Sequence, residues 1–161
     1  TSHIDFFSRT ENLEKKVLTQ DIIYVGGGNT KSMLAVWKEW NLHEILRNAY
    51  EKGIIMSGVS AGAICWFDKG ITDSYAEELA IIDCLGIVEG IACPHFDEEK
   101  DREPYVNDVI NREIIKSCIC IEGNCALHIK NNIEYSSIDF GEGRKSFRVY
   151  MENNTLKKEI I

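Results

Sequence analysis

The sequence has little of what a membrane or nucleic-acid partner requires. No apolar run approaches the roughly 18 residues expected of a transmembrane helix. Its 18 Lys and Arg residues are outnumbered by 26 Asp and Glu, which gives a net charge of −8, and they form no basic stripe of the kind that binds nucleic acid. We therefore expect no membrane and no nucleic-acid partner, and a peptide or small molecule is the favoured ligand.

The chain also lacks C-x-x-C pairs, although it contains six cysteines. None of these cysteines is spaced from the four histidines as zinc ligands would be. Cys65, Cys118 and Cys120 lie in apolar stretches, which is typical of small core residues. The pattern favours reduced thiols in a cytoplasmic protein without a metal site, and a disulfide framework is the weaker alternative.

The chain is long enough for one domain with a real core. Its 161 residues are 44% hydrophobic, and no internal repeat or low-complexity tract divides them. We therefore predict a single domain over residues 1–161. The sequence begins without methionine, which is consistent with a C-terminal part of a longer natural protein.

Strand and helix patterns alternate along the chain. Apolar runs predict strands at 21–25, 54–57, 91–93, 118–121 and 126–129, with a short strand or two within 81–91, around 85–88, and an edge hairpin around 146–150. Helical periodicity predicts helices at 10–20, 29–46, 61–67 and 104–117, whereas 68–80 is polar and is expected to be irregular. The alternation predicts an α/β fold, with a mostly parallel sheet and helices on both faces.

The most informative motif is the pentapeptide Gly-Val-Ser-Ala-Gly at 58–62. It follows the apolar run 54–56 and precedes a small-residue helix start. In this context G-x-S-x-G forms a sharp turn that exposes the serine hydroxyl at the sheet edge, where a nucleophile is needed. Ser60 is therefore the candidate nucleophile. The alternative is a serine that only caps or packs a helix.

A serine nucleophile needs a base and an acceptor that orients the base. His95 follows a short strand and a proline, at a strand end where a catalytic group belongs, although a capping or packing role is the alternative. Glu122 also follows an apolar strand and could accept the second imidazole proton. Asp73 is the competing acid, and either acid could simply form a turn or face solvent.

A developing oxyanion needs backbone donors. The Ala61 N–H comes directly after the serine, and the glycine loop 26–28 could supply a second donor because its backbone can approach a substrate closely. A phosphate-binding loop is the alternative for these glycines. The loop has neither a G-x-G-x-x-G nor a Walker pattern, so we expect no nucleotide and no other cofactor.

Four ordered motifs carry a resemblance to a known family. They are Tyr24-Val25-Gly26-Gly27-Gly28-Asn29-Thr30, Gly58-Val59-Ser60-Ala61-Gly62-Ala63, Cys93-Pro94-His95-Phe96 and Glu122-Gly123-Asn124. Together they closely resemble the peptidase E family of serine peptidases, which are α-aspartyl dipeptidases with a fold like that of class I glutamine amidotransferases. Val59 and the Cys-Pro-His segment look like a less-characterised branch of that family.

The resemblance implies a role for each matching residue. These roles are Ser60 as nucleophile, His95 as base, Glu122 as triad acid with Asp73 as second choice, Gly28 and Ala61 as oxyanion donors, and Asn29 and Arg102 as substrate-binding residues. In the family a basic residue beyond the histidine binds the aspartyl carboxylate, and Arg102 is the nearest match in a shorter loop. The resemblance also implies a first strand and helix that we expect this chain to lack, and their absence would leave sheet edges uncovered.

The residues and the resemblance together predict a cytoplasmic serine peptidase acting on short peptides, including dipeptides with N-terminal aspartate. It would use a Ser-His-Glu triad and an acyl-enzyme. The alternatives are an acyl hydrolase or esterase with the same serine turn, and an inactive fragment or binding module. A homodimer would cover the exposed sheet edges, but the sequence does not decide the oligomeric state.

Overall fold

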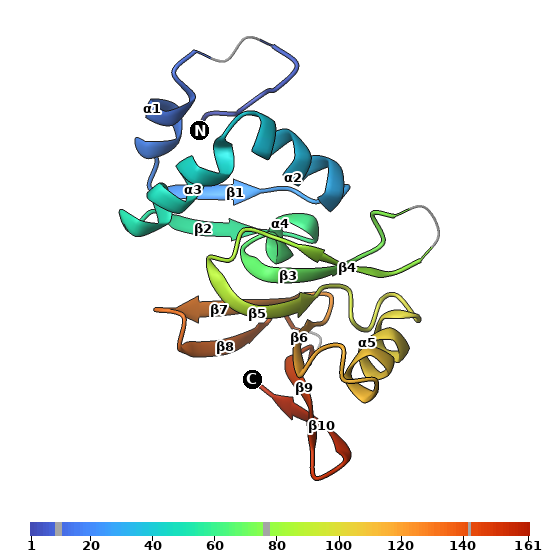
Figure 1. The fold of residues 1–161 in the computed structure, drawn as a ribbon. Coiled ribbons are helices and arrows are strands. Elements are labelled where there is room, and N and C mark those ends of the chain that lie inside the picture. Colours follow the sequence, from blue (N-terminus) through green and yellow to red (C-terminus); the bar gives the residue numbers. More distant parts are fainter. Residues whose placement is uncertain (9–10, 76–77, 142) are drawn as a thin grey trace.

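The structure, a computed structural model, describes residues 1–8, 11–75, 78–141 and 143–161. Helices and strands alternate through most of the chain (Figure 1). The helices are α1 (Leu13–Leu18), α2 (Thr30–Glu39), α3 (Leu42–Glu51), α4 (Ala61–Ile64) and α5 (Arg102–Asn111). The strands are β1 (Ile22–Val25), β2 (Ile55–Gly58), β3 (Phe67–Thr72), β4 (Ala80–Asp83), β5 (Val88–Cys93), β6 (Ser117–Ile121), β7 (Cys125–Lys130), β8 (Glu134–Asp139), β9 (Ser146–Glu152) and β10 (Thr155–Ile160).

The central sheet is mixed. Its six strands follow the order β10-β9-β6-β5-β3-β4, and the central strands β3, β5 and β6 are parallel. The flanking strands β4, β9 and β10 pair antiparallel, so parallel pairing is confined to the middle of this sheet. Strands β1 and β2 form a separate parallel pair, and β7 and β8 form a separate hairpin.

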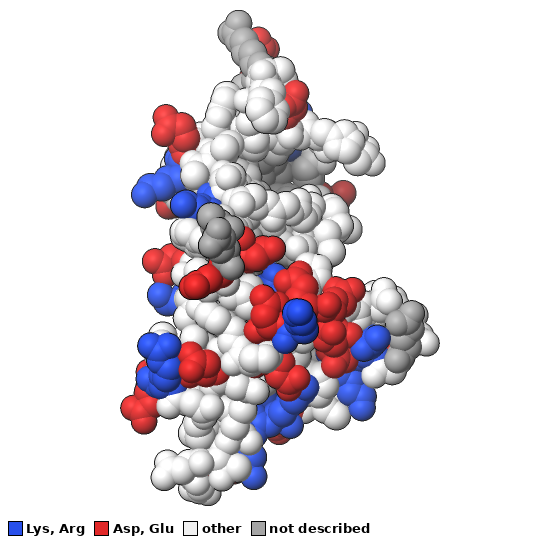
Figure 2. All heavy atoms as spheres, turned by 90° about the vertical axis from the view of Figure 1, so that its right-hand side faces the viewer, with Lys and Arg blue, Asp and Glu red and all other residues white. Residues whose placement is uncertain are grey.

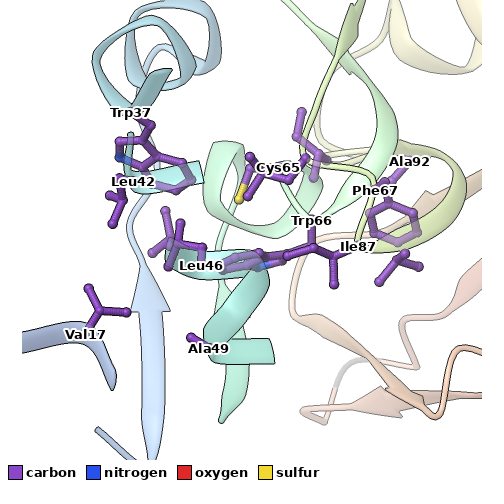
Figure 3. Close-up of a cluster of buried hydrophobic side chains, with 14 of the residues drawn as sticks. Val17, Trp37, Leu42, Leu46, Ala49, Cys65, Trp66, Phe67, Ile87 and Ala92 are labelled. Atoms are coloured by element: carbon purple, nitrogen blue, oxygen red, sulfur yellow. The ribbon is translucent and has the colours of Figure 1, made fainter. Parts of the chain in front are cut away.

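Two clusters of buried side chains cover opposite faces of the central sheet. On β5 and β6, Ala92 and Ile119 belong to one cluster, while their neighbours Cys93 and Cys120 belong to the other. Successive residues of a strand point to opposite faces, so the sheet is packed on both sides. Figure 3 shows the first cluster, in which side chains of α3 meet the 65–67 segment. Helix α5 packs in the second cluster. The α/β class with helices on both faces is confirmed.

Two predicted helices differ from those in the structure. The helix expected over 29–46 is two helices, because Asn41 adopts a left-handed conformation (φ 54°) that interrupts the hydrogen bonding. The helix expected over 61–67 is only the short α4, and β3 begins at Phe67. The irregular segment expected at 68–80 was therefore wrong for 68–72, which belong to β3, and for 80, where β4 begins. Residues 76 and 77 of that segment lie outside the described residues.

Other element boundaries also needed correction. Within 81–91 the structure has the end of β4 and the start of β5. These strands flank the predicted centre at 85–88, because 84–87 connect them. Helix α5 ends at Asn111, short of the predicted residue 117, and β8 was not predicted. The predicted edge hairpin is present as β9 and β10, with β10 at the edge of the sheet. Among the described residues, no helix is long and apolar enough to cross a membrane.

Candidate active site

Ser60 lies in a strained turn between β2 and α4. Its backbone has φ 56° and ψ −118°, a conformation that residues with a Cβ rarely adopt. Such strain persists only where the surrounding structure enforces it, and it is typical of a serine lifted out of a strand-to-helix turn. The pentapeptide therefore has the local geometry that its sequence predicts.

Two glycines allow this turn to pack against β1. A Cβ on Gly62 would lie closer than 3.0 Å to the Val25 carbonyl oxygen, a distance that real Cβ atoms essentially never show. A Cβ on Gly58 would lie 2.7 Å from the same oxygen and would also collide with the Gly62 carbonyl. The first and last residues of the pentapeptide are glycines because backbone occupies the space of a side chain.

The glycine loop after β1 lies beside the serine. A Cβ on Gly27 would be 3.2 Å from Ser60 Cβ and 3.8 Å from Ser60 Oγ. Gly28 has φ 143°, which is also unfavourable for other residues. Ala61 is the first residue of α4, so its N–H belongs to the helix start that has no intrahelical acceptor. The structure thus brings the loop containing Gly28, and Ala61, next to Ser60.

His95 reaches the serine from the end of β5. Its Nε2 lies 2.9 Å from Ser60 Oγ, which is hydrogen-bond distance. His95 itself has a positive φ of 55°, so the chain turns sharply directly after the strand. Residues 35 positions apart are therefore brought together as a nucleophile and a base would be.

The carboxylate beside His95 is Glu98, which sequence reasoning missed. Glu98 Oε2 lies 2.6 Å from His95 Nδ1. The Glu98 N–H donates to the His95 carbonyl at 3.2 Å, so a single turn places the two side chains together. A carboxylate three residues after a histidine at a strand end was the signal, but it was hidden in a run of charges.

Neither predicted acid is the partner of His95 among the described contacts. Glu122 Oε2 accepts the Lys145 N–H at 2.9 Å, and the Glu122 N–H donates to the Lys145 carbonyl. Asp73 is well exposed and lies 3.9 Å from the Arg102 guanidinium. The structure places both acids at strand ends on the expected edge, but with other neighbours.

The family model for Peptidase family S51 matches residues 2–134 of the chain. The chain belongs to peptidase family S51. It is also 40% identical over 156 residues to a Bacillus subtilis (strain 168) protein named uncharacterized peptidase YgaJ, covering 96% of this chain and 67% of that protein. The expected relation to the peptidase E family is confirmed, and the chain is a peptidase.

A solved structure agrees in fold with this S51 chain. It is the crystal structure of a protein from Listeria monocytogenes EGD-e provisionally assigned to peptidase E. The TM-score is 0.62 at 21% identity, over 82% of this chain and 67% of that one. The likeness supports the peptidase E-like α/β architecture.

The two residues expected to bind substrate have structural partners in this S51 peptidase. Arg102 is only 2% exposed, and its guanidinium donates to Glu99 Oε2 at 2.7 Å and to the Ile71 carbonyl at 2.9 Å. Asn29 caps α2 by accepting the Ser32 N–H, and its amide donates to the Ser74 carbonyl. This geometry does not support a role for Arg102 in binding a substrate carboxylate.

The face toward which the β1 and β2 arrows of Figure 1 point is rich in acidic side chains (Figure 2). The segment after His95, residues 97–103, contains five acidic and two basic residues. Its cations are partly neutralised locally, since Arg102 is paired with Glu99. The segment after His95 in the S51 chain is therefore predominantly acidic.

Proposed function

We propose that this S51 chain is a serine peptidase that hydrolyses short peptides with Ser60 as nucleophile and His95 as base. The observation that carries the proposal is the 2.9 Å contact between Ser60 Oγ and His95 Nε2 at a strained turn. Because the chain belongs to a peptidase family, we expect this pair to act on a peptide bond. A serine and a histidine in this arrangement activate the hydroxyl for acyl transfer.

The reaction would proceed through an acyl-enzyme. Ser60 Oγ forms a bond to the substrate carbonyl carbon while its proton passes to His95 Nε2. The C–N bond then breaks, and His95 returns the proton to the leaving amine. Water attacks the ester carbonyl, gives a proton to His95 and releases the acid, and Ser60 regains its proton.

The oxyanion of each tetrahedral intermediate would be held by backbone N–H groups. The Ala61 N–H follows the nucleophile, and the Gly28 N–H belongs to the loop that touches Ser60 through Gly27. In serine hydrolases one such donor contributes roughly 3 kcal/mol to transition-state stabilisation. These two donors could therefore supply much of the rate acceleration.

The substrate class in this proposal is a short peptide, and N-terminal aspartate is the narrower version of it. That narrower version came from the family resemblance, in which Arg102 was the nearest match for the residue that binds the aspartyl carboxylate. Arg102 is buried and paired with Glu99. We therefore expect peptides with neutral or basic first residues to be cleaved at least as well as Asp-X dipeptides. A panel of dipeptides that differ only in the first residue measures this preference.

The decisive variant for the proposal is Ser60→Ala. We expect peptide hydrolysis to fall to background while the thermal unfolding transition stays within a few degrees of the wild type. Ser74→Ala, a serine on the loop that docks on α2, is the matched control and should keep its activity. Hydrolysis that persists in Ser60→Ala would refute the assignment. Cleavage of p-nitrophenyl acetate without peptide cleavage would favour an esterase.

We also propose that the protein works in the cytoplasm. All six cysteines are free, and four of the six are buried, as expected of a chain kept in a reducing compartment. A homodimer stays a prediction, for which the exposed Ile22, Tyr24 and Ile55 on the β1–β2 pair offer apolar surface. Light scattering across a concentration series would test it.

A further inference from the structure

We infer that Glu98 is the residue that positions His95, and that Gly123 is a glycine because Glu98 lies across it. This inference rests on the proposed function, since it assigns the third member of the same site. The geometric basis is the 2.6 Å contact between Glu98 Oε2 and His95 Nδ1, opposite the Nε2 that faces Ser60. A carboxylate there holds the proton on Nδ1, which leaves Nε2 free to accept from the serine.

Gly123 provides the space that Glu98 occupies. A Cβ on Gly123 would lie closer than 3.0 Å to the Glu98 carboxyl carbon, Oε1 and Cγ. Gly123 does not have a positive φ, so its backbone conformation alone would accept other residues. A methyl group at this position would therefore displace the flexible end of the Glu98 side chain rather than backbone.

The turn that contains Glu98 is fastened to the end of β6 at several points. The Phe96 N–H donates to the Ile121 carbonyl at 3.0 Å, and Asp97 Oδ1 accepts the Gly123 N–H at 2.7 Å. Asp97 also pairs with Arg144, which leads into β9. These contacts fix the backbone directly before Glu98, so the turn that carries its carboxylate is anchored beside the imidazole.

Glu122 has a different place in the same region. Its carboxylate accepts the Lys145 N–H, and its own backbone exchanges a second hydrogen bond with Lys145. This pair fastens the start of β9 to the end of β6. Glu122 is therefore the matched control for Glu98, because both are glutamates at one sheet edge and only Glu98 contacts His95.

The first experiment compares Glu98→Gln with Glu122→Gln. Glutamine keeps the shape over Gly123 but removes the negative charge that stabilises a protonated imidazole. The measured quantity is the rate at which a fluorophosphonate labels Ser60. We expect Glu98→Gln to slow labelling by at least about 10-fold, less than the ~10⁴-fold loss for a buried triad aspartate, because the Glu98 side chain is half exposed. Glu122→Gln should label within about threefold of the wild-type rate.

A spectroscopic measurement separates positioning from a merely structural effect. In ¹⁵N-histidine NMR spectra of the wild type, the His95 Nδ1–H proton should resonate far downfield because it is shared with a carboxylate. That resonance should move upfield in Glu98→Gln and stay in place in Glu122→Gln. Thermal unfolding of the same samples checks that both variants are folded.

Gly123→Ala tests the second half of the inference. The added methyl group should push Glu98 away from His95, and it should therefore reproduce the slow labelling of Glu98→Gln. In the double variant Glu98→Gln/Gly123→Ala, we expect no further loss beyond the larger single effect, because both changes break one contact. If Gly123→Ala unfolds, the Glu98→Gln spectrum alone decides the inference.

The outcomes distinguish this inference from the proposed function. If wild-type Ser60 is not labelled at all, the serine peptidase proposal fails. If Ser60 is labelled but Glu98→Gln labels at the wild-type rate with an unchanged Nδ1–H resonance, the role of Glu98 is refuted. Slow labelling in Glu122→Gln with an altered Nδ1–H resonance would instead give the positioning role to Glu122.

Discussion

Gly62 faces the backbone of β1 so closely that no side chain fits there. A Cβ would collide with the Val25 carbonyl, which belongs to rigid sheet backbone. We predict that Gly62→Ala lowers the free energy of unfolding by about 1–3 kcal/mol, as overpacking usually does, and slows labelling of Ser60 as the turn shifts. Urea unfolding and fluorophosphonate labelling measure the two effects.

Gly26 is the control for that substitution. A Cβ there would meet no heavy atom within 4 Å, and its φ is not positive, so Gly26→Ala should change the free energy of unfolding by no more than about 0.5 kcal/mol. If Gly62→Ala proved as harmless as Gly26→Ala, the tight packing of the serine turn on β1 would be contradicted.

Arg102 is the most buried charged side chain among the described residues, and it acts as a structural link. It joins α5 to Glu99 and to the carbonyl at Ile71 in β3. Arg102→Ala should lower the free energy of unfolding by about 3 kcal/mol, because it leaves a cavity and an unsatisfied buried carbonyl. Arg112→Ala, at an exposed ion pair with Asp108, should cost no more than about 0.5 kcal/mol in the same urea titration.

Equal losses of unfolding free energy in Arg102→Ala and Arg112→Ala would show that Arg102 does not stabilise the contact between α5 and β3. A pure loss of affinity for Asp-X dipeptides in Arg102→Ala, with stability unchanged, would restore the substrate-binding role that the sequence suggested.

At the scale of elements, Asn41 separates α2 from α3. Its left-handed backbone suits asparagine and glycine and disfavours branched side chains. We predict that Asn41→Gly changes the free energy of unfolding little, whereas Asn41→Val lowers it by about 1–2 kcal/mol. Thermal unfolding of the two variants measures the difference, and two equally stable variants would contradict the assigned break.

The elements that the sequence predicts well are those with continuous apolar runs. Strands β1, β2 and β6 are of this kind, and they are the strands that carry the glycine loop, Ser60 and Glu122. Strand β3 was missed because it contains Asp68 and Lys69, whose charges resemble a loop. Their partners lie elsewhere in the chain, since Asp68 accepts the Gly90 N–H and Lys69 pairs with Asp83.

At the scale of the whole molecule, the buried thiols make stability depend on pH. Burial raises the pKa of the Cys65, Cys93 and Cys118 thiols well above the usual value, and burial and then Asp83 raise that of Cys84 to about 12. In the unfolded chain these thiols lose their protons near pH ~8.5. The unfolded state therefore binds fewer protons than the native state above that pH, and stability should fall as pH rises.

We predict that the free energy of unfolding is flat through neutral pH and decreases between pH 8.5 and 10, as measured by urea titration. Each such thiol contributes up to about 1.4 kcal/mol per pH unit above the unfolded pKa. In Cys93→Ala the alkaline slope should be smaller than in the wild type, whatever its stability at pH 7. A slope unchanged by that substitution would contradict burial of this thiol in the folded state.

Only part of the candidate site could be predicted from the sequence. Ser60 and His95 were predicted to lie together because each follows a strand at one sheet edge, and their side chains are 2.9 Å apart in the structure. The acid was placed at Glu122 by the same logic, yet the carboxylate beside His95 belongs to Glu98. That contact depends on a turn with a left-handed histidine and on a bare glycine across the edge, and neither is encoded as a local pattern.

Ser60 is tested as the nucleophile by the intact mass of the folded protein after incubation with a fluorophosphonate, with Ser60→Ala as the control. In the reaction, Ser60 Oγ bonds to phosphorus, fluoride leaves, and the serine proton passes to His95. We expect one adduct in the wild type and none in the Ser60→Ala variant. A cooperatively unfolding wild-type sample without an adduct, or an adduct that persists in Ser60→Ala, would contradict it.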